Sequence, residues 1–232
     1  MDRLEREKLK HDKFVEQVGH TIEVASEHKG GLYKIGGTVL AVIVIAFAIY
    51  FYLDSQASAR QEALRQAMRV QQAQVGQGES EYVLSYPDQA TKDRETEKAL
   101  REVANKYSGS NEAAIAHFYL GAMYADQGKN SEAEKEWKVV ADSSDKAYSS
   151  QAKFSLSQLY ASDGRTADAE KVLRDLIANP TFMVSKEQAT ITLARVLASS
   201  KPEEARKLLE PLRTERSAVS RTALNALGEL PR

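Results

Sequence analysis

One uninterrupted apolar stretch constrains this chain of 232 residues more than any other feature. Residues 35–53 read IGGTVLAVIVIAFAIYFYL and carry no charged side chain. As a helix, this stretch would span about 28 Å, close to the roughly 30 Å hydrocarbon core of a bilayer. The alternative is a buried core helix, but core helices rarely run this long without a charge. We therefore predict a single transmembrane helix that contacts lipid over residues 35–53.

The residues that flank this stretch bear on its orientation and on whether it is retained. Lys34 precedes it and Asp54 follows it, which leans toward a cytoplasmic N-terminus, although the Lys and Arg counts on the two sides do not decide. Ala57-Ser58-Ala59 matches a signal-peptidase pattern. The apolar run is, however, longer than the usual signal-peptide core, and a tail precedes it. We expect residues 1–34 to form a cytoplasmic tail and the anchor to be retained.

Composition excludes several classes of function. The 32 basic and 33 acidic residues give a net charge of −1, without the basic excess of a nucleic-acid binder. There is no cysteine, and the four histidines have no metal-ligand spacing around them. No nucleophile elbow or phosphate-binding loop is present either. We expect no catalytic set, no metal, no cofactor and no nucleic-acid partner.

Three shorter segments surround the apolar stretch. The tail carries a weak amphipathic pattern that suits a solvated or a partner-docking helix, with Gly30-Gly31 expected to break it. Gly37 and Ala41 form a small-xxx-small pair that would let another membrane helix approach, although such residues are common in membrane helices. We predict that residues 54–90 form a helical stalk to about Val75 and then a loop. Four apolar residues of that loop would cover the next helix: Tyr82, Val83, Leu84 and Tyr86.

From residue 91 onward the sequence predicts helices that repeat. Six positions recur after 36 residues, and a degenerate third copy follows. Gly128 and Gly164 suit left-handed helix stops, Ser131 and Ser185 have capping-box spacing, and Pro202 suits a first helical turn. The first copy is Leu120, Gly121, Tyr124, Gly128, Ala133 and Trp137; the second is Leu156, Ser157, Tyr160, Gly164, Ala169 and Leu173; the third is Leu193, Ala194, Leu197, Ala205 and Leu209.

This pattern resembles the tetratricopeptide repeat, whose unit has a similar length and a large–small–aromatic first helix. The resemblance implies helix–turn–helix units that stack on a shared core, with half-repeats near 91–107 and 217–229 at the ends. The predicted fold is all-α: a single transmembrane helix plus a short tetratricopeptide-repeat solenoid over residues 91–232.

The whole layout is similar to the YfgM-like family of bacterial inner-membrane proteins. That resemblance implies a single-pass protein with a periplasmic repeat domain, associated with the Sec translocon and with periplasmic chaperones. Partners would then be translocon subunits, chaperones or unfolded client chains.

The second face of the first helix in each repeat is the candidate peptide-binding groove. In this fold that face lines the concave surface, and its composition here suits an extended, apolar or weakly polar peptide. The same aromatic residues could instead be core. The candidates are Ile115, Phe118, Ala122, Phe154, Gln158, Ile191 and Arg195. Two functions remain open: a non-enzymatic interaction module that handles translocated chains, and a structural scaffold that organises an envelope complex without binding clients.

Overall fold

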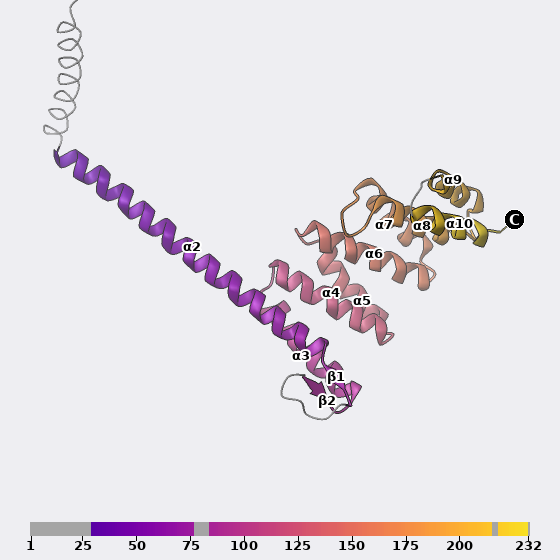
Figure 1. Ribbon diagram of the computed structural model, residues 1–232, viewed down its shortest axis with the longest axis horizontal. Helices are drawn as coiled ribbons and strands as arrows, with labels where there is room; N and C mark the ends of the chain where they lie inside the picture. Colours follow the sequence, from indigo (N-terminus) through magenta and orange to yellow (C-terminus); the bar gives the residue numbers. More distant parts are fainter. Residues whose placement is uncertain (1–28, 77–83, 215–217, 232) are drawn as a thin grey trace, which may run out of the picture. The chain divides into compact units, whose positions relative to one another are not determined.

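The computed structural model describes residues 29–76, 84–214 and 218–231 (Figure 1). It divides into two compact units, Met1–Ser58 and Ala59–Arg232. The amphipathic pattern predicted in the tail, and Tyr82 and Val83 of the predicted loop, lie outside the described residues.

The predicted membrane span lies within one helix, α2 (Lys29–Gln71). Within the described ranges, α2 is the one helix long and apolar enough to cross a membrane. Its large apolar side chains from Val39 to Leu53 are exposed, as lipid-facing side chains would be. The predicted break at Gly30-Gly31 is wrong, because both glycines lie inside α2. Each costs only about 1 kcal/mol in a helix, which is not enough to stop a long one.

The helical stalk ends earlier than predicted, at Gln71 rather than near Val75. Two short strands follow, β1 (Gln74–Val75) and β2 (Ser85–Tyr86), which pair in parallel. The Gln74 amide donates to the Leu84 carbonyl at 3.0 Å, and Gly76 adopts the left-handed conformation with a φ of 75°. The strands are too small to change the all-α class.

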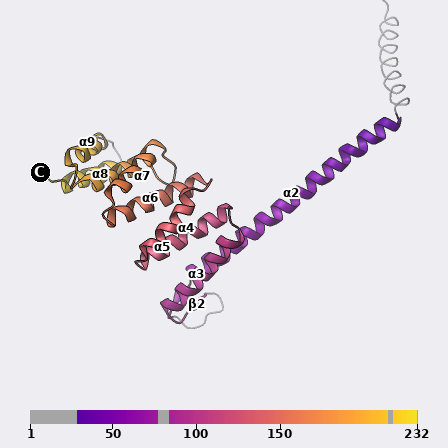
Figure 2. The same ribbon diagram turned by 180° about the vertical axis from the view of Figure 1, so that it is seen from behind.

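The rest of the chain is a succession of helices in which each packs against the next (Figures 1 and 2). The turns between the paired helices of one repeat are short, so those helices run antiparallel. The bounds are α3 (Gln89–Lys106), α4 (Asn111–Asp126), α5 (Asn130–Ala141), α6 (Lys146–Ser162), α7 (Thr166–Ala178), α8 (Lys186–Leu197), α9 (Pro202–Arg213) and α10 (Ala218–Glu229).

Local signals place most of these helix ends. Gly128 and Gly164 adopt the left-handed conformation at the turns, with φ of 70° and 73°. Ser185 caps α8 by accepting from the Gln188 amide at 3.1 Å, and Pro202 occupies the first turn of α9. The capping box predicted at Ser131 is wrong. Lys129 is the N-cap of α5, two residues before Ser131, because the glycine turn leads directly into the helix.

The second helix of every repeat buries the same set of positions. Helices α5, α7 and α9 each place an alanine, a large side chain and a further aliphatic residue in the core at matching intervals. Helix α3 has the same register, with threonine in place of alanine. The four sets are Thr96, Leu100 and Val103; Ala133, Trp137 and Val140; Ala169, Leu173 and Leu176; and Ala205, Leu209 and Leu212.

Helix α3 is therefore the second helix of a first repeat, and the end of α2 supplies its partner. Ala67 of α2 is 2% exposed and belongs to the same core cluster as Leu100 and Val103. Arg60 of α2 also pairs with Glu112 of α4, with 3.3 Å between Nε and Oε2. The compact repeat unit begins at Ala59, whereas the sequence analysis placed its start at residue 91.

Candidate protein-interaction surface

The candidate groove residues on α4 are only partly covered by the rest of the repeat unit. Ile115, Phe118 and Ala122 are each half-buried. The opposite face of α4 is in the core, where Leu120 and Tyr124 are buried. This division follows from the helical period, because the two sets lie on different faces of α4.

The corresponding apolar residues of the next two repeats are buried. Phe154 is 7% exposed and Ile191 is 6% exposed, and both belong to the core cluster formed with Leu173 and Leu193. Of the two alternatives left open for these residues, burial in the core applies to Phe154 and Ile191, whereas Phe118 is half-buried. The Phe154 and Ile191 side chains pack into this cluster together with residues of α7, α8 and α9.

The polar candidates of the same face are exposed. Gln158 of α6 and Arg195 of α8 both face solvent. Arg195 Nε lies 3.4 Å from Glu229 Oε2 at the end of α10. The structure therefore offers an apolar surface on α4 and a polar one on α6 and α8. A peptide-binding role for these residues stays a prediction.

Two tyrosines that the sequence analysis did not select extend the apolar surface. The Phe118 ring makes edge-to-face contacts with Tyr119, at 5.7 Å between centroids, and with Tyr148 of α6, at 5.9 Å. Burial raises the pKa of the Tyr148 hydroxyl, and the nearby Tyr119 and Asp145 raise it further. Aromatic side chains of this kind are enriched at protein interfaces. We call Phe118, Tyr119 and Tyr148 the aromatic group.

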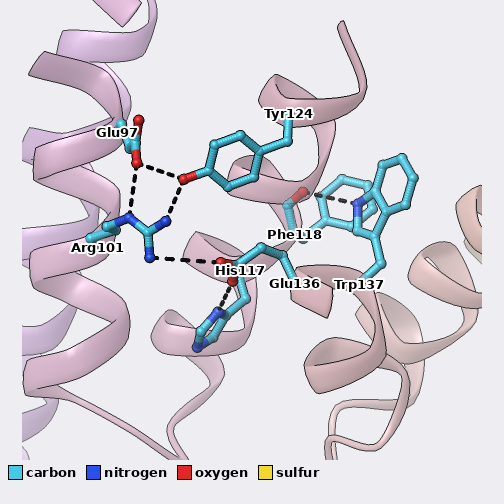
Figure 3. A network of polar contacts seen from close by, with 7 residues as sticks. All are labelled: Glu97, Arg101, His117, Phe118, Tyr124, Glu136 and Trp137. Carbon is cyan, nitrogen blue, oxygen red and sulfur yellow. Dashed lines mark hydrogen bonds and ion pairs between the residues drawn. The ribbon is translucent and has the colours of Figure 1, made fainter. Parts of the chain in front are cut away.

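A polar network fixes α4 between its two neighbours (Figure 3). The Tyr124 hydroxyl donates to Glu97 of α3 at 2.6 Å and accepts from Arg101. Burial raises the pKa of Tyr124 to about 12, and the hydrogen bond with Glu97 adds to the effect. The same bond lowers the pKa of the Glu97 carboxyl. Glu136 of α5 completes the network by contacting His117, with 2.6 Å between Oε2 and Nδ1.

Parts of this network recur in later repeats. Glu134 of α5 accepts from Arg165 at 2.8 Å, and Glu170 of α7 accepts from Lys201 at 2.9 Å. Each carboxylate lies one position after the buried alanine, and each cation directly follows a turn. Lys129, Arg165 and Lys201 are spaced by 36 residues. This 36-residue spacing is the signal from which these three cations could have been predicted. We call these Glu–Lys/Arg pairs the turn pairs; they join consecutive repeats rather than forming a catalytic arrangement.

Metal binding and helix–helix packing in the membrane are two further candidate roles for the described side chains. Among the described residues, no group of three or more His, Cys, Asp or Glu side chains could hold a metal ion. Gly37 has open space around its Cα on α2. Packing of another membrane helix against Gly37 and Ala41 stays a prediction.

Comparisons with known proteins support the fold. A scan of protein-family models and a search of curated proteins found no match. Two solved structures of a Podosopora anserina chain, described as a kinesin light chain with nearly identical TPR-like repeats, are similar to this one. They are 17% and 18% identical, with TM-scores of 0.53 and 0.52; each alignment covers 73% of this chain and 84% of the other. The repeat unit therefore has a tetratricopeptide-repeat-like fold.

Proposed function

We propose that this chain is a membrane-anchored, non-enzymatic protein-interaction module of the bacterial inner membrane. Its repeat unit would lie in the periplasm and bind newly translocated chains near the Sec translocon, together with periplasmic chaperones. Three observations support this proposal: the candidate span in α2, the tetratricopeptide-repeat-like fold, and the similarity in layout to the YfgM-like family.

The observation that carries the interaction role is the half-buried aromatic group on α4 and α6. Phe118, Tyr119 and Tyr148 present apolar ring area on helices whose other faces are already packed. An extended polypeptide could bury that area without moving the helices, because the rings are already held against one another. Sequence-tolerant apolar contact of this kind suits a binder of unfolded chains.

A scaffold that holds one folded partner is the second candidate. The burial of Phe154 and Ile191 favours it, because a client-binding groove would then be apolar over one repeat only. A fixed partner could use the exposed polar side chains of α6 and α8 instead. The two functions differ in what the chain binds: many unfolded sequences weakly, or one folded protein stoichiometrically.

The test uses the full-length protein in mild detergent and a fluorescent, permanently unfolded model polypeptide. The double substitution Phe118→Ser and Tyr148→Ser should weaken binding about tenfold, which corresponds to about 1.4 kcal/mol. Val139→Ser is the matched control, because Val139 is 52% exposed and lies on α5, outside the aromatic group. Melting temperatures are measured first, so that lost binding is compared only between folded variants.

The outcomes separate the two candidates. Weaker binding in the double variant, with Val139→Ser unchanged, supports the client-binding role. Equal binding by all variants would show that clients contact another surface. If the unmutated protein ignores the unfolded polypeptide and one folded protein co-purifies with it in a fixed ratio, the scaffold is the correct function.

A further inference from the structure

A polar cavity lies beside the groove face of the first repeat. It has a volume of about 410 Å³ and is bounded by the end of α2, the first turns of α3 and the last turns of α4. Ala122, one of the predicted groove residues, lines it, so a polypeptide on that face would pass its opening. Its polar lining includes Gln89, Lys92, Asp93, Thr96, Asp126 and Gln127.

Thr96 is the unusual member of this lining. It occupies the position at which the other three second helices bury an alanine: Ala133, Ala169 and Ala205. Thr96 is 4% exposed, and its hydroxyl has no hydrogen-bond partner. In α8, by contrast, Thr190 donates to the carbonyl four residues earlier at 2.7 Å. A buried hydroxyl without a partner destabilises the fold. Packing therefore does not explain why Thr96 carries a hydroxyl where its counterparts are alanines.

Asp93 is held in place at the same cavity by two amides. Gln89 Nε2 donates to one carboxylate oxygen at 2.6 Å, and Gln127 Nε2 approaches the other at 3.4 Å. Because both amides use N–H groups for Asp93, their carbonyl oxygens remain available as acceptors. Asp126 adds a second carboxylate, against the single cation Lys92 in this lining. The cavity thus has an excess of acceptors and of negative charge.

We propose that this cavity binds an arginine side chain of an extended polypeptide held on the groove face. A guanidinium carries five N–H donors in a rigid fork and cannot lose its charge. It would donate to the Asp93 carboxylate, to Asp126 and to the Thr96 hydroxyl, while its methylene stem passes Ala122. The Thr96 hydroxyl is covered by neighbouring atoms, so a rotation about χ1 would be needed to turn it toward the guanidinium. This assignment rests on the proposed polypeptide-binding function and specifies a side chain that the surface would prefer.

The experiment compares two fluorescent twelve-residue peptides binding to the full-length protein in detergent. They share a sequence of serine, alanine and leucine and differ at one central position, which is arginine or its neutral isostere citrulline. The arginine peptide should bind about tenfold more tightly, as expected for one charge-assisted hydrogen bond. Asp93→Asn and, separately, Asp126→Asn should reduce that preference. Glu132→Gln is the matched control, because Glu132 is an exposed carboxylate on α5 outside the cavity.

The substitution Thr96→Ala tests whether Thr96 has a role in binding as well as in the fold. It restores the alanine of the other repeats, so the melting temperature should rise, while binding of the arginine peptide should weaken about threefold. Binding by Thr96→Ala equal to that of the unmutated protein would count against the site. A third peptide with lysine at the central position separates the effect of charge from that of the guanidinium shape. If the lysine peptide binds as tightly as the arginine peptide, the guanidinium assignment is wrong.

Failure of this inference and failure of the proposed function give different results. If arginine and citrulline peptides bind equally well, and Asp93→Asn and Asp126→Asn change neither, the cavity is not an arginine site and polypeptide binding stands. If neither peptide binds, both proposals are wrong. If Asp93→Asn lowers the melting temperature strongly, Asp126→Asn still tests the arginine site. Asp126 is exposed, and its substitution breaks no hydrogen bond that holds the helices together.

Discussion

Gly121 of α4 lies directly against the Trp137 indole of α5. A Cβ built on Gly121 would approach Trp137 Cδ1 and Nε1 to 2.6 Å, closer than any real Cβ contact. The indole cannot easily move away, because its Nε1 donates to the Phe118 carbonyl at 3.1 Å. The small residue of the repeat pattern is therefore required by this particular neighbour.

The first prediction follows from that contact. Gly121→Val should destabilise the repeat unit by about 1–3 kcal/mol, because the branched side chain overpacks the α4–α5 interface. Gly228→Ala on α10 is the control, since a Cβ there meets no atom within 4 Å and should be neutral or slightly stabilising. Thermal unfolding followed by circular dichroism measures both. Equal melting temperatures for the two variants would contradict the described packing.

The second prediction concerns the role of α2 in the first repeat. Ala67→Glu should destabilise the fold by about 3 kcal/mol, because the carboxylate would be buried without a partner against Leu100 and Val103. Ala59→Glu, two turns earlier on the exposed face of the same helix, should have little effect. Denaturant unfolding of the full-length protein in detergent compares the two. If Ala67→Glu unfolds like Ala59→Glu, α2 does not complete the first repeat.

The third prediction is a pH dependence set by Tyr124. Its pKa is raised from an ordinary value of 10 to about 12, so the hydroxyl stays protonated in the folded state while the unfolded state ionises. The stability that this shift contributes is complete below pH 10 and is lost as the pH rises toward 12. The difference in melting temperature between the unmutated protein and Tyr124→Phe should therefore shrink over this range. Tyr119→Phe is the control, and a constant Tyr124→Phe difference from pH 9 to 12 would refute the linkage.

The fourth prediction is the membrane topology. Protease added to spheroplasts should digest the repeat unit and leave a membrane-bound fragment with the tail and the span, because Lys34 and Asp54 favour a cytoplasmic N-terminus. Lysed spheroplasts serve as the control for access to both sides of the membrane. Survival of the intact chain in sealed spheroplasts would reverse the orientation.

The sequence was sufficient for the fold class and for most helix boundaries. Apolar spacing, the glycine turns and the Ser185 cap act over a few residues, so they can be read from short windows. The first repeat could not be recognised in this way. Residues 72–88 separate its two helices and interrupt the 36-residue period, and Thr96 replaces the alanine that marks the second helix elsewhere.

The candidate surface was only partly predictable, for a different reason. Helical spacing gives the face on which a residue lies, but not what covers that face. Phe118, Phe154 and Ile191 occupy matching positions, yet neighbouring helices cover the last two and leave the first half-exposed. The cavity beside Ala122 draws on three helices, so no local pattern predicts it.

The turn pairs have a consequence for how such a chain can change its length. Glu134 meets Arg165 and Glu170 meets Lys201, each across the boundary between one repeat and the next. Because the carboxylate and the cation recur with the repeat itself, an in-frame duplication or loss of one 36-residue unit would recreate a matched pair at the new boundary. Repeats could then be gained or lost in evolution without new substitutions at the boundary between them, and a protein designer could add or remove repeats in the same way.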